Sequence, residues 1–110
     1  MGHYIANLRD IEFCLFDLLE RESILGKSIY KDLDRETAMG MLEEVKRMAE
    51  NDLAESFIDG DRLGVKFDPA TGDAKLPESF KKSYKTFMDN EWWRIDAPVE
   101  LGGTAIPPSV

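Results

Sequence analysis

The sequence predicts an all-α fold class: a helical segment of about three helices, with a small β-hairpin between helices two and three. Three stretches repeat apolar residues at steps of three and four, which is the period of one helix face. A further stretch, between Asp59 and Leu76, lacks that period and contains an Asp-Pro turn followed by a glycine. Helices therefore dominate the 110 residues, and the hairpin interrupts them once.

The first predicted helix starts at Leu8 and continues to Leu25. Asn7 stands where a side chain can cap the first turn, and Gly26 stands where a left-handed residue commonly ends a helix. The apolar face of this helix consists of Leu8, Ile11, Leu15, Leu18 and Leu19.

The second predicted helix is the longest element and starts after Asp34, which is a favourable N-cap. Gly40 inside it costs about 1 kcal/mol relative to alanine. This glycine indicates either that a neighbouring backbone packs close to it or that the first turns are soft. The apolar stripe consists of Ala38, Met41, Leu42, Val45, Met48, Ala49, Leu53 and Phe57.

The predicted hairpin and the third helix follow. Val65 and Phe67 alternate with Lys66 in the period of a strand, and the segment 68–73 has the composition of a turn. Pro77 suits the first position of the third helix. The stripe of that helix consists of Phe80, Tyr84, Phe87, Met88, Glu91 and Trp92, with Lys81, Lys82 and Lys85 on the other side.

Composition and charge exclude several classes of protein. The net charge of -8 repels nucleic acid phosphates and anionic lipid surfaces. No stretch approaches the ~20 apolar residues that a membrane span needs, so none is expected. No secretory signal is visible, and a single cysteine cannot form an internal disulfide. We therefore expect a cytoplasmic protein without a nucleic acid partner.

No catalytic, cofactor-binding or metal site is predicted within residues 1–110. His3 lies near the terminus, and Cys14 is expected to pack as a small apolar side chain with no base nearby in sequence. The loop from Asp68 to Asp73 lacks the spacing of a calcium loop. A turn is the simpler interpretation of that loop.

Charged and aromatic clusters also have simple interpretations. The lysine cluster of the third helix could hold a phosphate, but a solvated helix side is more common. Glu43 and Glu44 are expected to form surface ion pairs, and one of the adjacent Trp92 and Trp93 is expected in the core. Gly102-Gly103 lacks the frame of a phosphate cradle.

The apolar stripes exceed what this chain can cover. The second and third helices each carry a long stripe, whereas only the shorter first helix is available to pack against both. The glycine pair and Pro107-Pro108 form a shaped connector after the aromatic helix. We therefore expect residues 1–110 to be the front piece of a larger protein.

Three stretches carry a family resemblance. Residues 4–13, Tyr-Ile-Ala-Asn-Leu-Arg-Asp-Ile-Glu-Phe, resemble the start of a long-chain branch of bacterial acyl-CoA dehydrogenases. Residues 67–72 with 76–82 are similar to the hairpin and next helix of that branch, and residues 97–103 resemble its Pro-x-Glu-x-Gly-Gly connector. Cys14, Gly40 and the Leu63-Gly64-Val65 stretch depart from the family pattern.

The resemblance implies that residues 1–110 form a partial N-terminal helical domain of a flavoenzyme whose β middle and helical C-terminal domains follow. Such an enzyme removes the α proton of an acyl-CoA with a glutamate and passes the β hydride to FAD. That glutamate and most flavin contacts belong to the later domains, so this segment is expected to bind no FAD and to be inactive alone. It would contribute to the acyl-binding side and to interdomain packing.

The resemblance also implies partners for the parent enzyme: an acyl-CoA substrate, electron-transfer flavoprotein and further copies in a homo-oligomer. It leaves the acyl chain length open, because the branch includes enzymes of short sulfur-containing thioesters. The alternative function is a stand-alone helical interaction module that presents the aromatics between Phe80 and Trp93 to a protein partner.

Overall fold

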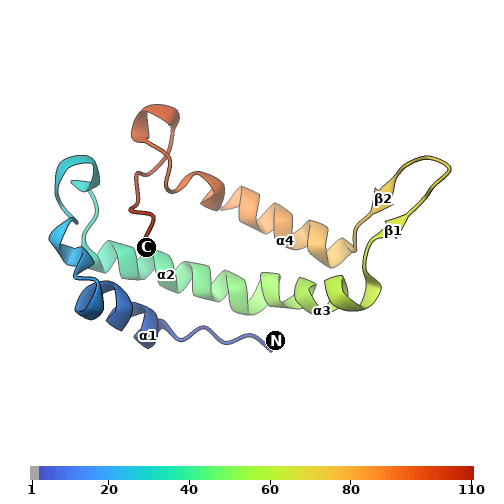
Figure 1. Ribbon diagram of the computed structural model, residues 1–110, viewed down its shortest axis with the longest axis horizontal. Helices are drawn as coiled ribbons and strands as arrows, with labels where there is room; N and C mark the ends of the chain where they lie inside the picture. The colour runs from blue at the N-terminus through green and yellow to red at the C-terminus, as the bar shows by residue number, and fades with distance from the viewer. Residues whose placement is uncertain (1–2) are drawn as a thin grey trace.

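A computed structural model describes residues 3–110 as an elongated body of 55 × 33 × 19 Å (Figure 1). A long helical rod made of α2 (Arg35–Met48) and α3 (Ala54–Leu63) runs along the body. α1 (Leu8–Glu12) lies beside one end of this rod, and α4 (Glu78–Asp89) lies beside the other (Figure 1). The predicted class, about three helices with a hairpin before the last, is confirmed.

The first helix comprises α1, Leu8–Glu12, and a π-helical turn, Phe13–Leu18. The side chain of Asn7 accepts a hydrogen bond from the backbone N–H of Asp10 at 3.3 Å, so the predicted N-cap is confirmed. The helix ends seven residues earlier than predicted. The cause lies at Glu20, whose left-handed backbone turns the chain out of the helix.

Gly26 does adopt a left-handed conformation, with φ of 73°, but it shapes a loop instead of ending the first helix. Two short 3-10 turns, Arg21–Ser23 and Ser28–Tyr30, flank it. Its N–H donates to the carbonyl of Tyr30 at 3.0 Å. Leu25 of this loop is buried in the core and Ile24 is partly buried, whereas Ile29 is 67% exposed.

The rod consists of α2, Arg35–Met48, a π-helical turn, Ala49–Leu53, and α3, Ala54–Leu63. The carboxylate of Asp34 accepts from the N–H of Thr37 at 2.7 Å, which confirms the predicted cap.

The predicted stripe is wrong at Phe57, which is 67% exposed and does not lie in the core. The π-helical turn changes the phase of the helix, and the packing partner changes from α1 to α4 along the rod. Ala54 and Ser56 are the buried residues of α3 instead.

Gly40 is exposed, and a Cβ added to it would meet no atom within 4 Å outside its own helix turns. Of the two predicted explanations, a close-packed neighbouring backbone is therefore wrong within residues 3–110. The glycine only lowers the helix propensity of α2.

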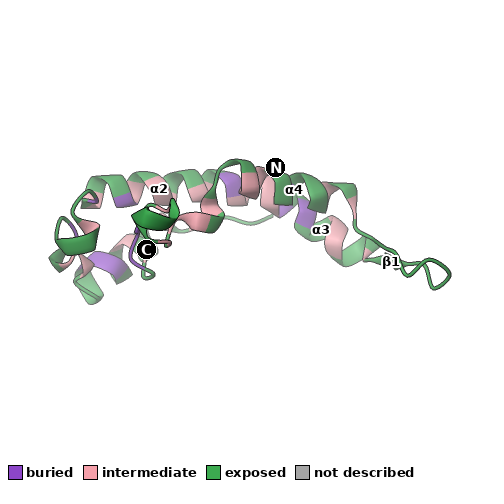
Figure 2. Cartoon of the chain, turned by 90° about the horizontal axis from the view of Figure 1, so that it is seen from above, coloured by how far each residue is buried: buried purple, intermediate pink, exposed green. Residues whose placement is uncertain are grey.

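The predicted hairpin is confirmed as β1, Lys66–Phe67, and β2, Ala74–Lys75, which pair antiparallel. The N–H of Asp68 donates to the carbonyl of Asp73 at 2.8 Å across the turn, and Gly72 supplies a φ of 76°. Both strands are exposed, and the hairpin projects from the helical body (Figure 2).

α4 spans Glu78–Asp89. Pro77 is its N-cap, whereas the prediction placed Pro77 at the first helical position. The predicted stripe is only half covered, because Phe80 and Tyr84 are exposed. Small residues form the contact with α3 instead. A 3-10 turn, Trp92–Arg94, follows the helix.

The apolar core lies at the end where α1 meets α2. The C-terminal segment folds back to this end and inserts Ile106, which is 3% exposed. The buried core cluster consists of Leu15, Phe16, Leu25, Leu33, Ala38 and Ile106.

The chain is less compact than its length allows. Its radius of gyration is 17.5 Å, against about 13 Å for a compact domain of this length. Its accessible surface is 8016 Å², against about 6,200 Å² for a compact monomer of 12.5 kDa. The chain therefore leaves more surface in water than a compact domain of its size, and large apolar side chains such as Leu18, Phe57 and Leu101 are among its exposed residues, in line with the predicted surplus of apolar surface.

Candidate functional site

The most prominent candidate for a functional feature is the apolar surface that the helices expose at both ends of the molecule. A compact soluble monomer seldom leaves so many large apolar side chains in water, and contiguous patches of them mark interaction sites. On the helices, the exposed members are Ile11, Phe13 and Leu18 of the first helix, Phe57, Ile58 and Leu63 of α3, and Phe80 and Tyr84 of α4.

The aromatic face of α4 is uncovered because the helix packs through its hydroxyl residues. The hydroxyl of Ser83 donates to that of Ser56 on α3 at 2.9 Å, and Ser83 is buried. Phe80 and Tyr84 lie about a quarter turn around the helix from this contact. They are 44% and 60% exposed.

An apolar groove of about 300 Å³ lies between the N-terminal segment and the rod. His3 stacks at a tilt against Phe57, with ring centroids 5.2 Å apart, and Tyr4 forms another wall. The N–H of Ala6 donates to a carboxylate oxygen of Glu50 at 2.9 Å, which ties the N-terminal segment to the rod. His3 packs against Phe57, and none of the described residues that line the groove is acidic or a cysteine or serine.

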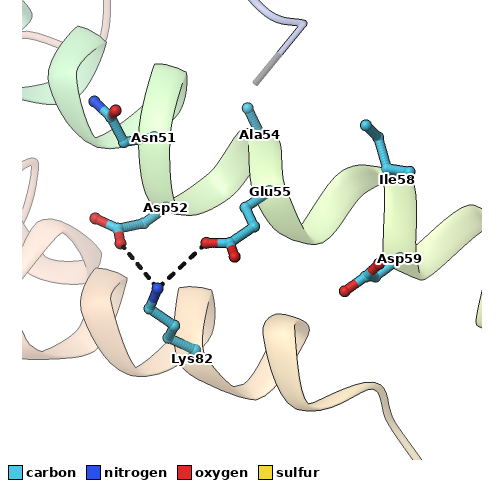
Figure 3. A pocket seen from close by; sticks show the side chains of 7 residues that line it. All are labelled: Asn51, Asp52, Ala54, Glu55, Ile58, Asp59 and Lys82. Carbon is cyan, nitrogen blue, oxygen red and sulfur yellow. Dashed lines mark hydrogen bonds and ion pairs between the residues drawn. The ribbon is translucent and has the colours of Figure 1, made fainter. Parts of the chain in front are cut away.

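A second groove, of about 520 Å³, lies along the rod beside α4 (Figure 3). Lys82 reaches across it from α4 to Glu55 at 3.2 Å and to Asp52 at 3.9 Å. The other two lysines of the predicted cluster pair within α4, Lys81 with Glu78 and Lys85 with Asp89.

These contacts favour the simpler interpretation of the lysine cluster. Each of its ammonium groups has a carboxylate partner, so the cluster is not arranged to hold a phosphate. Likewise Glu44 pairs with Arg47 at 2.8 Å, as predicted, whereas Glu43 forms no ion pair within residues 3–110, contrary to the prediction. Exposed pairs of this kind stabilise a fold little.

Sequence reasoning missed Arg35, which joins three elements at the core end. Its guanidinium lies 2.9 Å from Glu12 of α1, 3.4 Å from Glu22, and 4.5 Å from the ring centroid of Phe16. The hydrogen bond to Glu12, with the added negative charge of Glu22, raises the pKa of Arg35 above its ordinary value. No short-range spacing in the sequence predicts these partners, because they lie 13 and 23 residues away.

The remaining candidates take structural roles. Cys14 is exposed, so its expected burial is wrong; the core lies on the side of Leu15 and Phe16. The carboxylate of Asp68 accepts from the N–H of Ala70 at 2.9 Å and serves the turn. Within residues 3–110, no group of three His, Cys, Asp or Glu side chains could hold a metal ion.

The glycine pair fits against the chain itself. A Cβ on Gly103 would lie 2.0 Å from the carbonyl oxygen of Ala97, so only glycine fits there. Gly102 has a φ of 82°, and Ala105 donates back to Ala97 at 3.0 Å. The backbone of the loop therefore packs closely against Ala97.

Curated relatives agree with the sequence resemblance. The chain is 44% identical over 110 residues to the broad-specificity linear acyl-CoA dehydrogenase FadE5 of Mycobacterium tuberculosis. It is 30% identical over 107 residues to the 3-methylmercaptopropionyl-CoA dehydrogenase of Ruegeria pomeroyi. The chain is similar to acyl-CoA dehydrogenases. No family model matches it.

These matches cover 100% and 97% of this chain but only 18% of each acyl-CoA dehydrogenase. The predicted resemblance to acyl-CoA dehydrogenases is confirmed. It extends through the connector at residues 97–103, whose glycine requirement the loop geometry explains. Across residues 3–110, no helix combines the length and the apolar character needed to cross a membrane.

Proposed function

We propose that residues 1–110 form part of the N-terminal helical domain of an FAD-dependent acyl-CoA dehydrogenase. The observation that carries this proposal is the 44% identity along the whole chain to such a dehydrogenase. The segment supports the acyl-binding side of the enzyme and packs against its other domains. The exposed apolar surface of α1, α3 and α4 supports this role, because interdomain packing would remove it from water.

The chemistry of the parent enzyme lies outside this segment. An acyl-CoA dehydrogenase takes a proton and a hydride from adjacent carbons of the acyl chain, and the hydride is transferred to FAD. In this proposal the glutamate base and most of the flavin contacts belong to the later domains of the parent enzyme. We therefore assign no reaction step to these residues, and the segment alone is expected to be inactive.

The substrate and partners of the parent are also part of this proposal. The two relatives are named for linear acyl-CoA and for 3-methylmercaptopropionyl-CoA, so a CoA thioester is the shared substrate class. Electron-transfer flavoprotein as acceptor, a homo-oligomer and a cytoplasmic location complete the proposal.

The test uses the complete product of the gene. It should purify yellow with about one FAD per chain, and it should reduce an artificial electron acceptor when given an acyl-CoA. A colourless product, or one that no acyl-CoA reduces, would contradict the proposal.

One observation favours a second function. Phe80 and Tyr84 form an exposed aromatic face on α4, which suits a stand-alone interaction module. This module would be favoured over the enzyme if the natural gene encodes a protein of 110 residues that contains no flavin and binds a protein partner. The variant Tyr84→Ala should then no longer bind that partner.

A further inference from the structure

The hairpin carries a free strand edge. Both strands are exposed, and the hairpin projects away from the helices (Figure 1). The N–H of Asp68 donates to the carbonyl of Asp73, and the carbonyl of Asp68 accepts from the N–H of Gly72, so the backbone of Asp68 faces the other arm. Backbone direction alternates along a strand, and therefore the N–H and C=O groups of Phe67 and Val65 point away from β2. No further strand within residues 3–110 pairs with this outer edge of β1.

The side chains of this edge also alternate between two faces. Val65 and Phe67 share one face, and they are 57% and 65% exposed. Lys66 and Asp68 share the other face. Lys66 forms no ion pair within residues 3–110, and its register partner in the hairpin is another lysine, Lys75. The edge therefore presents an apolar face and a face with an unpaired positive charge.

The charges of this edge are self-complementary. Two copies of β1 can pair antiparallel about a twofold axis at Phe67, where the outward backbone groups of both copies meet. Lys66 of each copy then lies opposite Asp68 of the other. One carboxylate oxygen of Asp68 accepts from the N–H of Ala70, so the second oxygen is left to accept from the lysine. On the opposite face, the two phenylalanines form an aromatic cross-strand pair.

The neighbouring registers lack this match. An axis at Lys66 would place two lysines directly opposite each other, and an axis at Asp68 would do the same with two aspartates. Like charges directly opposite are destabilising. Pro69 has no N–H to donate, so the pairing ends beside it. The edge is therefore suited to one register and to a short pairing.

We infer that the outer edge of β1 is a contact between two copies of the complete protein, which pair antiparallel about Phe67. This inference rests on the proposed function, because a homo-oligomer is part of it, and it names one surface of that oligomer. Backbone hydrogen bonds hold such an added strand, and alternate side chains select the partner. Two short strands bury far less than the roughly 1,200 Å² of a stable interface, so further contacts of the complete protein also join the copies.

A disulfide across the axis tests the pairing. In the complete gene product, Phe67→Cys changes an exposed strand residue and places two thiols at paired positions about 5.5 Å apart between Cα atoms, which a disulfide can span. Mild oxidation should give a covalent dimer on a non-reducing gel, and digestion should release two copies of the peptide of position 67 joined to each other.

The matched control is Thr71→Cys at the exposed tip of the hairpin, four residues beyond the axis in each copy. It should form at least about tenfold less dimer, because the two tips lie at opposite ends of the paired strands. Equal yields from the two variants would overturn the inference. So would a peptide of position 67 joined mainly to a different peptide.

Charge reversal tests the register. With Phe67→Cys already present, Lys66→Glu places a carboxylate opposite Asp68 of the second copy and should lower the dimer yield at least about threefold. The control Lys31→Glu changes the net charge equally at an exposed loop lysine, and it should leave the yield unchanged. If the two charge variants give the same yield, the proposed register is contradicted.

The unmodified product separates this inference from the proposed function. Its flavin content and acyl-CoA turnover report whether it is the proposed enzyme. A yellow, active product in which Phe67→Cys behaves like the tip control would refute the edge pairing alone. A flavin-free product that cross-links at position 67 would refute the enzyme and support the edge pairing.

Discussion

The two ends of the molecule are held together in different ways. At the α1–α2 end, buried apolar residues from distant parts of the chain form a core, and Arg35 ties its rim. At the α3–α4 end, the helices meet through the hydroxyls of Ser56 and Ser83 and through the ion pairs of Lys82. The hydroxyl of Ser79 is buried there without a partner in the described chain.

This difference shows where the chain is complete in itself. Burial of apolar side chains is the main source of folding free energy, and exposed ion pairs add little. The core end is therefore expected to carry most of the stability, whereas the α3–α4 end depends on what covers its aromatic residues. The predictions below compare the two ends, in order of decreasing effect.

Gly103→Ala should have the largest effect, because the new Cβ would overlap the backbone of Ala97 and force the loop open. Opening the loop also displaces Ile106 from the core. We expect a loss of about 3 kcal/mol or more in the free energy of unfolding, measured by urea titration of tryptophan fluorescence. Gly60→Ala on α3 is the control, since no atom lies near its added Cβ. Equal stability of the two variants would contradict the closed loop.

Truncation of one apolar residue at each end compares the ends directly. Ile106→Ala leaves a cavity in the core and should cost about 2 to 4 kcal/mol in the free energy of unfolding. Phe80→Ala on the exposed face of α4 should cost less than about 1 kcal/mol. The same urea titration measures both. Losses of similar size would mean that the aromatic face of α4 is packed within this chain.

Gly40→Ala should stabilise the chain by about 0.5 to 1 kcal/mol, since alanine has the higher helix propensity and its Cβ meets open space. Thermal unfolding followed by circular dichroism measures the gain. A loss of stability would show that another backbone needs the glycine.

Acid should weaken the start of α2 by a small amount. The hydrogen bond from the N–H of Thr37 lowers the pKa of Asp34. A lowered pKa stabilises the folded chain above the unfolded value of about 3.9, and this contribution is lost as the pH falls through the lower folded-state value. Asp34→Asn keeps the cap without titrating, so its stability should fall less between pH 5 and pH 2. An identical pH profile would exclude a contribution from this carboxylate.

Local signals predicted the local structure. The caps at Asn7 and Asp34 and the turn of the hairpin depend on residues within a few positions, and all three were predicted correctly. Two features were not predicted. Phe57 is exposed because a π-helical turn changes the phase of the rod, and the first helix ends early because Glu20 adopts a left-handed conformation.

Contacts between distant residues left no such signal, since the partners of Arg35 lie 13 and 23 residues away. Gly103 and Ala97 are close in sequence, but their close approach depends on the folded shape of the loop. Likewise, the sequence indicated a surplus of apolar surface but not which face of each helix remains uncovered.

Binding of a hydrophobic fluorescent dye tests the central claim most directly, namely that these helices carry apolar faces made to be covered by further polypeptide. The 110-residue chain should bind the dye while keeping its native circular dichroism, and the complete gene product at equal molar concentration should bind far less. A monomeric chain of 110 residues that binds no dye would contradict the claim.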